Sequence, residues 1–469
     1  MSSVKFGTSG LRGLVVDLVG QPTYDHTRAF VSALRTELAP GSPVLIGRDL
    51  RSSSAGIAAT VAAAVTASGF KPLDCGEVPT PALALEALRL ACPAVMVTGS
   101  HIPDDRNGLK FYTARGEITK DEEAAILRAL SFGVMASGAA EPHPEAAARF
   151  LARYREAFKG DALAGLRVGI YQHSTVARDV LVELIAALGG TPVPFGRSSA
   201  FVPVDTEAHR PQDLQTLKDA AAATALNAIV SADGDADRPL LADASGTVVP
   251  GDVIGTIAAR HLGVTAIAVP VTANSAIEAV GGFTRVIRTR IGSPFVVAGM
   301  TEAQRDGATA VAGFEANGGF LLGSNVVVDH HHIDALPTRD SVLPLLATLV
   351  AARLAGTTVA ALAASLHFKS TSSHRLQEVP PARSGPLLDR LRDPVARSAF
   401  LAPLGQVASV NEVDGVRVGF EGGAVIHFRV SGNAPELRCY AEDDTPAKAD
   451  RIVRMGLDLA AKAMALASA

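Results

Sequence analysis

Short apolar runs alternate with amphipathic stretches over the first 365 residues of the chain. An apolar run bounded by turn residues indicates a buried strand, whereas apolar residues spaced three or four apart indicate a helix. On these grounds we expect strands at 43–47, 95–97, 165–171, 228–231, 266–269 and 309–313, and helices at 52–69, 120–130, 145–158, 177–188 and 253–262. Helices that alternate with short strands predict parallel sheets with crossover connections.

The pattern changes after about residue 366. Two strand-like segments, 416–420 and 424–428, are separated by Glu421-Gly422-Gly423, which predicts a β-hairpin. A single late helix is expected at 446–466. This last part therefore predicts an α+β domain with an antiparallel sheet.

The order of these elements predicts an α/β protein of four domains. Three would contain mixed, mostly parallel α/β sheets, and the fourth would be the C-terminal α+β domain with its antiparallel sheet. A chain of 469 residues is long enough for three or four domains. The expected boundaries are 1–155, 156–251, 252–365 and 366–469.

Composition and charge narrow the classes of function. The net charge is −4 and no long basic stretch occurs, which argues against nucleic-acid binding. Neither the N-terminus nor the alanine-rich stretches have the pattern of a signal peptide or a membrane span. Cys75, Cys92 and Cys439 lack metal-ligand or redox spacing and fit reduced thiols. We therefore expect a cytoplasmic protein with no nucleic-acid or membrane partner.

Ser100 lies where the apolar run 95–97 breaks into a polar loop that ends at Pro103. Ligands of open α/β sheets collect beyond the carboxyl ends of strands. A serine at such a place, beside His101, is a candidate nucleophile or phosphoryl carrier. An ordinary turn is the alternative, because serine is common in turns.

Asp233, Asp235 and Asp237 alternate with small residues directly after the strand expected at 228–231. Carboxylates are the ligands that Mg²⁺ and Ca²⁺ prefer, and three of them held together without a cation would repel one another. The glutamate that ends a helix-loop-helix calcium motif is absent, since its position is Ala244. The pattern indicates a metal site, with a solvated acidic turn as the alternative.

Three further segments could bind a phosphate or a sugar. The segment 429–438 could bind a phosphate through Arg429, Ser431, Gly432, Asn433 and Arg438. The loop 313–319 offers Glu315 and Asn317 to sugar hydroxyls, and the segment 6–13 could present Arg12 to an anion. Each of these segments alone also fits an ordinary loop.

Taken together, these segments resemble the α-D-phosphohexomutase family, in the order in which that family uses them and over nearly the whole chain. The segment 6–13 resembles the opening loop of the family, and 98–103 with 107–110 resembles its phosphoserine loop. The segments 233–238, 315–319 and 429–438 resemble its metal, sugar-recognition and phosphate-binding loops. The resemblance implies a phosphohexomutase whose four domains surround a central cleft.

The sequence departs from the commoner family patterns at several positions. The smaller departures are Gly99 for an alanine, Ile102 for an asparagine, Ala236 for a glycine, and Asn433-Ala434 for a Thr-Glu pair. The sugar-recognition loop departs most, because Asn317 stands in for a serine and Gly319 for a histidine. These two positions leave the choice of hexose open.

The resemblance also implies a mechanism. Ser100 would carry a phosphoryl group, give it to a hexose monophosphate, and take back the other phosphate of a hexose 1,6-bisphosphate, which is both intermediate and activator. One Mg²⁺ per active site would be held by Ser100, Asp233, Asp235 and Asp237. The implied catalytic residues are Ser100, His101, Lys110, Arg12 and Arg238, with His101 and Lys110 as candidates for general acid–base work. The implied substrate-binding residues are Glu315, Asn317, Arg290, Ser293, Arg429, Ser431, Gly432, Asn433 and Arg438.

The implied reaction interconverts the 1-phosphate and 6-phosphate of a hexose, mannose or glucose. A phosphoglucosamine mutase and a metal-dependent sugar phosphatase are the alternatives, and a phosphosugar-binding protein without turnover is disfavoured because Ser100 and the three aspartates are intact. Both a monomer and a dimer are compatible with the sequence. The run 330–332 of three histidines is expected to be a solvated loop without a function of its own.

Overall fold

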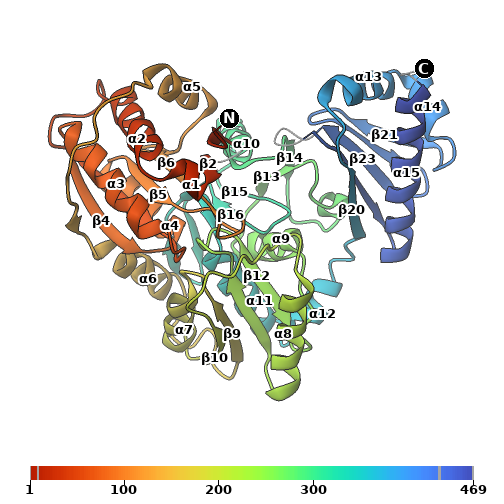
Figure 1. The fold of residues 1–469 in the computed structure, drawn as a ribbon. Coiled ribbons are helices and arrows are strands. Elements are labelled where there is room, and N and C mark those ends of the chain that lie inside the picture. Colours follow the sequence, from red (N-terminus) through yellow and green to blue (C-terminus); the bar gives the residue numbers. More distant parts are fainter. Residues whose placement is uncertain (1, 8–9, 431–434, 467–469) are drawn as a thin grey trace.

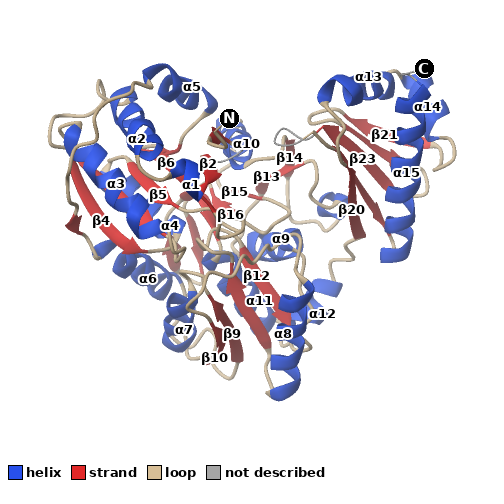
Figure 2. Cartoon of the chain, in the orientation of Figure 1, coloured by secondary structure: helices blue, strands red, loops and turns tan. Residues whose placement is uncertain are grey.

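The structure is a computed structural model that describes residues 2–7, 10–430 and 435–466. Four large sheets follow one another along the chain, each with its helices, and we call them the first to fourth units (Figures 1 and 2). In Figure 1 the first unit (red to orange) and the fourth (blue) lie on opposite sides of the view. Within the described residues, no helix has the length and apolar character that a membrane span needs.

The first unit holds a mixed sheet with strand order β1-β2-β6-β5-β3-β4-β8. Its elements are β1 (Lys5–Phe6), β2 (Leu11–Leu14), α1 (Val15–Leu18), α2 (Gln21–Ala33), β3 (Pro43–Arg48), α3 (Ser54–Ala67), β4 (Lys71–Glu77), α4 (Thr80–Leu90), β5 (Ala94–Val97), β6 (Arg106–Thr113), β7 (Gly116–Glu117), α5 (Lys120–Ala129), β8 (Glu141–Pro142) and α6 (Glu145–Ala157). The strands β3, β4 and β5 pair in parallel, as expected for crossover connections. Antiparallel pairs are at least as frequent in this sheet, because β6 turns back along β5 and the N-terminal strands extend it.

The second and third units have smaller mixed sheets, with orders β10-β9-β11-β12 and β14-β13-β15-β16-β19. The second contains β9 (Arg167–His173), α7 (Arg178–Ala187), β10 (Thr191–Arg197), α8 (Pro211–Ala223), β11 (Ala228–Ala232) and β12 (Pro239–Asp243). The third contains α9 (Gly251–His261), β13 (Ala266–Pro270), a short 3-10 helix (Ser275–Glu278), β14 (Arg285–Thr289), α10 (Ser293–Arg305), β15 (Val311–Phe314), β16 (Phe320–Leu322), β17 (Val326–Val328), β18 (His331–Ile333), β19 (Leu336–Asp340), α11 (Val342–Leu354) and α12 (Val359–Ala364).

These three sheets repeat one topology that the sequence does not reveal as a residue repeat. The orders β4-β3-β5-β6, β10-β9-β11-β12 and β14-β13-β15-β16 correspond strand by strand. In each, two neighbouring strands run parallel to a central one, and the fourth strand returns antiparallel through a hairpin. The three hairpin loops are therefore equivalent: 98–105, 233–238 and 315–319. We call them the serine loop, the aspartate loop and the sugar loop.

The fourth unit is an antiparallel sheet with order β20-β24-β23-β22-β21, which confirms the α+β expectation. Its elements are β20 (Ser370–Leu376), α13 (Pro381–Arg392), α14 (Pro394–Leu401), β21 (Val407–Asn411), β22 (Val416–Phe420), β23 (Val425–Val430), β24 (Leu437–Asp443) and α15 (Pro446–Leu466). Side chains of β22, β23, β24 and α15 form one apolar core, and Figure 1 shows α15 lying along the sheet. The last helix has the bounds that the sequence predicts.

Elsewhere the predicted elements differ from the observed ones by a few residues at their ends. The helix expected at 52–69 begins at Ser54, because the Ser54 hydroxyl donates to Asp49 and its N–H donates to the carbonyl of Arg51. The helix α5 begins where expected, with a capping box between Thr119 and Glu122. Local side-chain bonds of this kind set the ends of helices more sharply than hydrophobic spacing does.

Candidate functional site

The serine, aspartate and sugar loops lie at the carboxyl ends of β5, β11 and β15, and side chains link them to one another. Ser100 of the serine loop donates its hydroxyl proton to Asp233 Oδ2 at 2.6 Å. Arg339, at the end of β19, joins Asp237 of the aspartate loop to Glu315 of the sugar loop. Three loops far apart in the sequence therefore form one buried cluster.

Ser100 is buried and adopts a left-handed backbone conformation, with φ of +55°. This conformation costs a residue with a Cβ atom about 1–2 kcal/mol. Contacts with neighbouring residues must therefore stabilise it. The Thr98 hydroxyl accepts the N–H of Ser100 at 2.8 Å, and Arg51 donates to the carbonyl of Ser100 at 2.9 Å. These two hydrogen bonds, one to the N–H and one to the carbonyl of Ser100, hold its backbone so that the hydroxyl points toward the aspartate loop.

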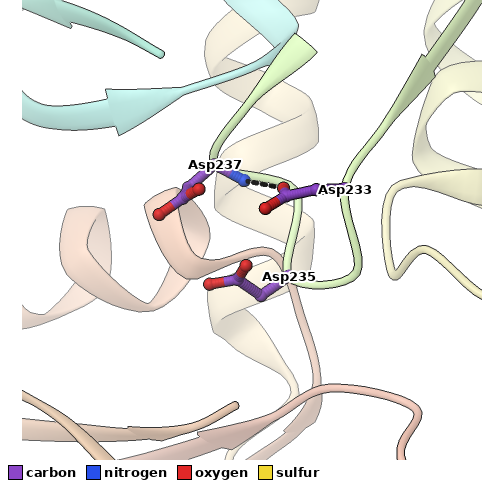
Figure 3. Close-up of side chains that lie close together, drawn as sticks. All are labelled: Asp233, Asp235 and Asp237. Carbon is purple, nitrogen blue, oxygen red and sulfur yellow. Dashed lines mark hydrogen bonds between the residues drawn. The ribbon is translucent and has the colours of Figure 1, made fainter. Parts of the chain in front are cut away.

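The three aspartates converge, as Figure 3 shows, with one carboxylate oxygen from each lying within 4.8 Å of the others. Burial, reinforced by the neighbouring Asp235 and Asp237, raises the pKa of Asp233 well above its usual value. Asp235 Oδ1 and Asp237 Oδ1 are buried and have no hydrogen-bond partner among the described residues. Unpartnered hard oxygen ligands beside a third carboxylate fit a Mg²⁺ ion.

Lys110 and Arg339 balance part of this negative charge. Lys110 Nζ lies 2.6 Å from both Asp235 Oδ2 and Asp237 Oδ2, and Arg339 Nη2 lies 2.8 Å from Asp237 Oδ2. Burial alone would raise the pKa of Asp237, but Arg339, Lys110 and Arg238 together hold it below its usual value. Burial alone would lower the pKa of Lys110, but Asp235 and Asp237 raise it. The lysine is therefore a fixed charge in this arrangement.

His101 lies between Ser100 and Arg238. Its Nδ1 lies 3.3 Å from Ser100 Oγ and accepts a hydrogen bond from Arg238 Nη1 at 2.8 Å. Burial, followed by the charge of Arg238, lowers the pKa of His101 to about 3, so the ring is neutral near pH 7. Arg12, on β2, lies near two further cations of the site, Arg238 and Arg339. Burial, followed by the charges of these two arginines, lowers the pKa of Arg12 to about 10.

The sugar-binding candidates lie in two places. Glu315 is buried in the sugar loop and bonds Arg339, while Asn317 Oδ1 accepts the N–H of Gly319 at 3.0 Å and so shapes the loop itself. Ser293 begins α10, and its hydroxyl donates to Glu117 of the first unit at 2.9 Å. Arg290 is exposed and donates to the carbonyl of Val413 in the fourth unit.

The phosphate-binding candidates belong to the fourth unit. Arg429, on β23, donates to Asp414 Oδ1 at 2.9 Å, and Arg438, on β24, lies 3.3 Å from Glu436. Ser431, Gly432 and Asn433 lie outside the described residues. In the part of the chain that the structure describes, no hydrogen bond joins these arginines to Ser100 or the aspartate loop.

Two arginines of the site are not among the sequence predictions. Arg51 is buried and distributes its five N–H groups over five oxygens: Asp49 Oδ2 and the carbonyls of Ser100, Ile102, Pro103 and Arg106. It follows the strand β3 within a polar segment, so the strand-end argument that identifies Ser100 could also have identified it. Arg339 lies inside a strand, and only the tertiary contacts reveal it.

His330 lies in the turn between β17 and β18, but His331 and His332 belong to β18 and not to the loop that the sequence predicts, and none of the three joins this cluster. His331 bonds the carbonyl of Glu156, and His332 lies 3.4 Å from Asp334. Among the described residues, the three aspartates are the group of carboxylate, histidine or cysteine side chains whose ligand atoms converge closely enough for a metal.

Two family models match the chain. The model described as phosphoglucomutase/phosphomannomutase, alpha/beta/alpha domain I, matches residues 3–132, and the corresponding model of domain III matches residues 250–368. The first match contains the serine loop, and the second contains the sugar loop. More than half of the chain is therefore matched by models of one family.

Curated relatives match nearly the full chain. A phosphomannomutase of Sinorhizobium fredii (strain NBRC 101917 / NGR234) is 46% identical over 464 residues, which cover 97% of this chain and 98% of that protein. A phosphomannomutase of Salmonella muenchen is 40% identical, covering 96% and 94%. The crystal structure of a phosphoglucomutase/phosphomannomutase family protein from Burkholderia thailandensis superposes with a TM-score of 0.77 at 22% identity, covering 97% of each chain. At that identity the last likeness concerns the fold alone.

Proposed function

The chain belongs to the phosphoglucomutase/phosphomannomutase family and is a phosphohexomutase, an intramolecular phosphotransferase; on this premise we propose that it interconverts mannose 1-phosphate and mannose 6-phosphate. The proposal of mannose rests on the two relatives that cover nearly the whole chain, both named phosphomannomutases. Glucose phosphates are the second substrates we expect, because the family model carries both names.

One observation carries the proposed mechanism: the buried Ser100 hydroxyl, in a left-handed backbone, lies 2.6 Å from an aspartate in a cluster of three. We propose that Ser100 carries the phosphoryl group between turnovers. In the first step the bond between phosphorus and Ser100 Oγ breaks, and one forms to a hydroxyl oxygen of the hexose monophosphate, which gives a hexose 1,6-bisphosphate. In the second, Ser100 Oγ takes the other phosphoryl group, and the isomeric monophosphate leaves.

The residues around Ser100 would share the remaining tasks. Asp233, Asp235 and Asp237, with an oxygen on Ser100, would hold one Mg²⁺, which supplies positive charge against the phosphoryl oxygens. Lys110, Arg12 and Arg238 would add fixed positive charge.

His101 is the better of the two candidates for moving the proton of the sugar hydroxyl. Its ring is neutral, whereas Lys110 is held as a cation by Asp235 and Asp237. His101 Nδ1 accepts from Arg238, so a phosphoryl group that binds Arg238 would free this nitrogen to take the proton.

The sugar and the unreacting phosphate would be held by the remaining candidates. Glu315 and Asn317 would bind sugar hydroxyls at O3 and O4, and Arg290 and Ser293 would lie beside them. Arg429, Ser431, Gly432, Asn433 and Arg438 would bind the unreacting phosphate. The ion pair between Arg429 and Asp414 supports this role, because a phosphate can replace the carboxylate on the guanidinium.

The variant Ser100→Ala tests the phosphoserine mechanism. The purified wild-type protein should contain a species heavier by one phosphate that the variant lacks, and interconversion of mannose 1- and 6-phosphate should fall by at least about 10³-fold. Ser245→Ala, at an exposed turn of the second unit, is the matched control and should keep both properties. Unchanged turnover in Ser100→Ala would overturn the mechanism. Phosphate release without a bisphosphate activator would instead identify a phosphatase.

A further inference from the structure

Arg339 occupies the space between the aspartate loop and the sugar loop. It is 6% exposed and lies at the end of β19, next to Asp340, which pairs with Phe320 at the start of β16. Its Nη2 lies 2.8 Å from Asp237 Oδ2, and its Nη1 lies 3.2 Å from Glu315 Oε2. One guanidinium therefore bridges a proposed metal ligand and a proposed sugar ligand.

Gly319 makes room for this side chain. A Cβ atom at position 319 would lie 2.8 Å from Arg339 Cδ, closer than real Cβ atoms approach, and 3.0 Å from Arg339 Cγ, which is also tight. Because Arg339 is buried and held at its head by two carboxylates, it cannot move aside. Position 319 and the stem of Arg339 thus share one space.

The bridge has an electrostatic reason. Asp237 and Glu315 are both buried, so their negative charges would repel strongly without a cation between them. Arg339 and Lys110 both bond Asp237 Oδ2, whereas Asp237 Oδ1 has no hydrogen-bond partner among the described residues and lies 3.8 Å from Arg238 Nε. Arg339 therefore fixes the orientation of Asp237 and that of Glu315 at the same time.

We propose that Arg339 is a positioning residue that sets the sugar loop relative to the aspartate loop, and that Gly319 is the position that allows it. This inference rests on the proposed function, since Glu315 is taken to bind the sugar. Arg339 acts through Glu315 and Asp237, so its loss should lower the catalytic efficiency with the sugar phosphate and strengthen the binding of Mg²⁺.

The variants Arg339→Met and Arg339→Lys test the coupling. Arg339→Met should lower kcat/KM for mannose 1-phosphate by about 100-fold, since two bonds between charged groups are lost, and Arg339→Lys should lower it less. In a double-mutant cycle with Glu315→Gln, the two losses should be far from additive. Arg353→Met is the matched control, because it removes a part-buried arginine of α11 that bonds the carbonyl of Ala164. This variant should leave kcat/KM unchanged.

Magnesium binding gives a second readout that does not depend on turnover. Removal of a cation from Asp237 leaves the aspartate loop more negative, so Arg339→Met should bind Mg²⁺ about tenfold more tightly in a calorimetric titration. A site that was only disordered by the substitution would bind Mg²⁺ more weakly. Weaker binding together with additive kinetic losses would overturn the proposal and leave Arg339 a merely structural residue.

The shared space is tested from the other side by Gly319→His. Alone, it should lower kcat/KM by about 100-fold or more, since overpacking a buried site commonly costs 1–3 kcal/mol and here also displaces the bridge. Combined with Arg339→Ala, the histidine should fit and part of the activity should return. If Gly319→His does not fold, Gly319→Ala gives the same test with a smaller side chain. Unchanged activity in a folded single variant would show that the space is not shared.

A failure of the proposed function is distinguishable from a failure of this inference. If the wild-type protein turns over no hexose phosphate, the proposed function is wrong. The magnesium titration of the wild type and of Arg339→Met then decides the inference alone, and tighter binding in the variant supports it.

Discussion

At the scale of single residues, the serine loop is held by one buried side chain, Arg51, whose hydrogen-bonding capacity is fully used. Arg51 donates all five of its N–H groups, four of them to backbone carbonyls of the segment 100–106. Its guanidinium also lies 3.9 Å from the ring centre of Phe201, a residue of the second unit. A buried arginine with this geometry can support the left-handed backbone of Ser100, which a flexible loop could not keep.

A buried carboxylate next to the sugar loop gives a prediction about pH. Asp252, in the first turn of α9, accepts the N–H of Asn274, and burial raises its pKa to about 6. Because the folded-state pKa is above the unfolded value, the protonated form favours folding, and its contribution is lost as the pH rises from about 4 through 6. Asp252→Asn should therefore stabilise the protein by about 2 kcal/mol at pH 8 and by much less at pH 5.

Urea unfolding of the wild type and of Asp252→Asn at both pH values measures this difference. Asp458→Asn, which removes an exposed carboxylate from α15, is the control and should change the free energy of unfolding little. An equal change in the free energy of unfolding of Asp252→Asn at pH 5 and pH 8 would contradict the raised pKa of Asp252.

Some residues of the site can be identified from the sequence pattern, whereas the roles of others cannot. The argument from strand ends identifies Ser100 and the three aspartates, and the structure brings all four together. It does not separate the roles of His101 and Lys110, because the charges around each come from other units. The neutral ring of His101 and the fixed charge of Lys110 follow only from their neighbours in space.

At the scale of elements, three equivalent hairpins supply the site. Each loop follows a buried parallel strand and is closed by an antiparallel strand, so its side chains are presented at a fixed place on the sheet edge. The same construction provides Ser100 in the first unit, the three aspartates in the second and Glu315 in the third. The repeat has no signature in the sequence, because strands of a given topology need apolar side chains but no particular ones.

The start of α9 supports the sugar loop, which predicts the effect of a small substitution. A Cβ atom at Gly251 would lie 2.3 Å from the backbone nitrogen of Gly318 and 2.5 Å from the carbonyl oxygen of Ala316. Since backbone atoms cannot rotate away, Gly251→Ala should displace the sugar loop. We expect about 2 kcal/mol of lost stability and a KM for hexose phosphate raised about tenfold.

Steady-state kinetics and thermal unfolding of Gly251→Ala check this prediction. The control is Gly56→Ala in α3, where nothing lies within 4 Å of the new Cβ and alanine favours the helix. The control should be neutral or slightly stabilising with an unchanged KM. A normal KM in Gly251→Ala would show that the sugar loop does not depend on α9.

At the scale of the whole molecule, the aspartate loop is the contact point of three units. Thr80, Ser100 and Lys110 of the first unit bond its aspartates. From the third unit, Arg339 bonds Asp237 and the Ser341 hydroxyl donates to the carbonyl of Ala236. Any cation bound by this loop would therefore stabilise the packing of the first three units together.

Hydrogen bonds between described residues link the fourth unit to the third in two regions. Near its first strand, the Ser275 N–H donates to Glu442 and the Asn274 side chain donates to the carbonyl of Lys369. Near the phosphate-binding candidates, the Ile291 N–H donates to Asp414, which also bonds Arg429. A cavity of about 330 Å³ has walls from the second, third and fourth units, and Glu442 of the first of these regions is part of its lining.

Removal of the metal tests whether the first three units are held together at the aspartate loop while the fourth is attached separately. Mg²⁺ at one hundred times its dissociation constant should stabilise the folded protein by about 2.7 kcal/mol, and EDTA should abolish the gain. In hydrogen exchange, Mg²⁺ should protect the serine and aspartate loops and leave β20–β24 unchanged. The Asp235→Asn variant should lose the response. Equal protection of all four units would contradict the separate attachment of the fourth.

The sequence by itself determined the alternation of short strands and helices over most of the chain, the α/β and α+β plan, and Ser100 with the three aspartates as candidate site residues. These features follow from local patterns, since apolar spacing selects elements and polar residues at strand ends mark ligand sites. Only the tertiary structure decided which loops are equivalent, that Ser100 meets Asp233, and that Arg51 and Arg339 hold the loops in place. Those contacts join residues that are between 24 and 133 positions apart in the chain, and such distant pairing leaves no local pattern in the sequence.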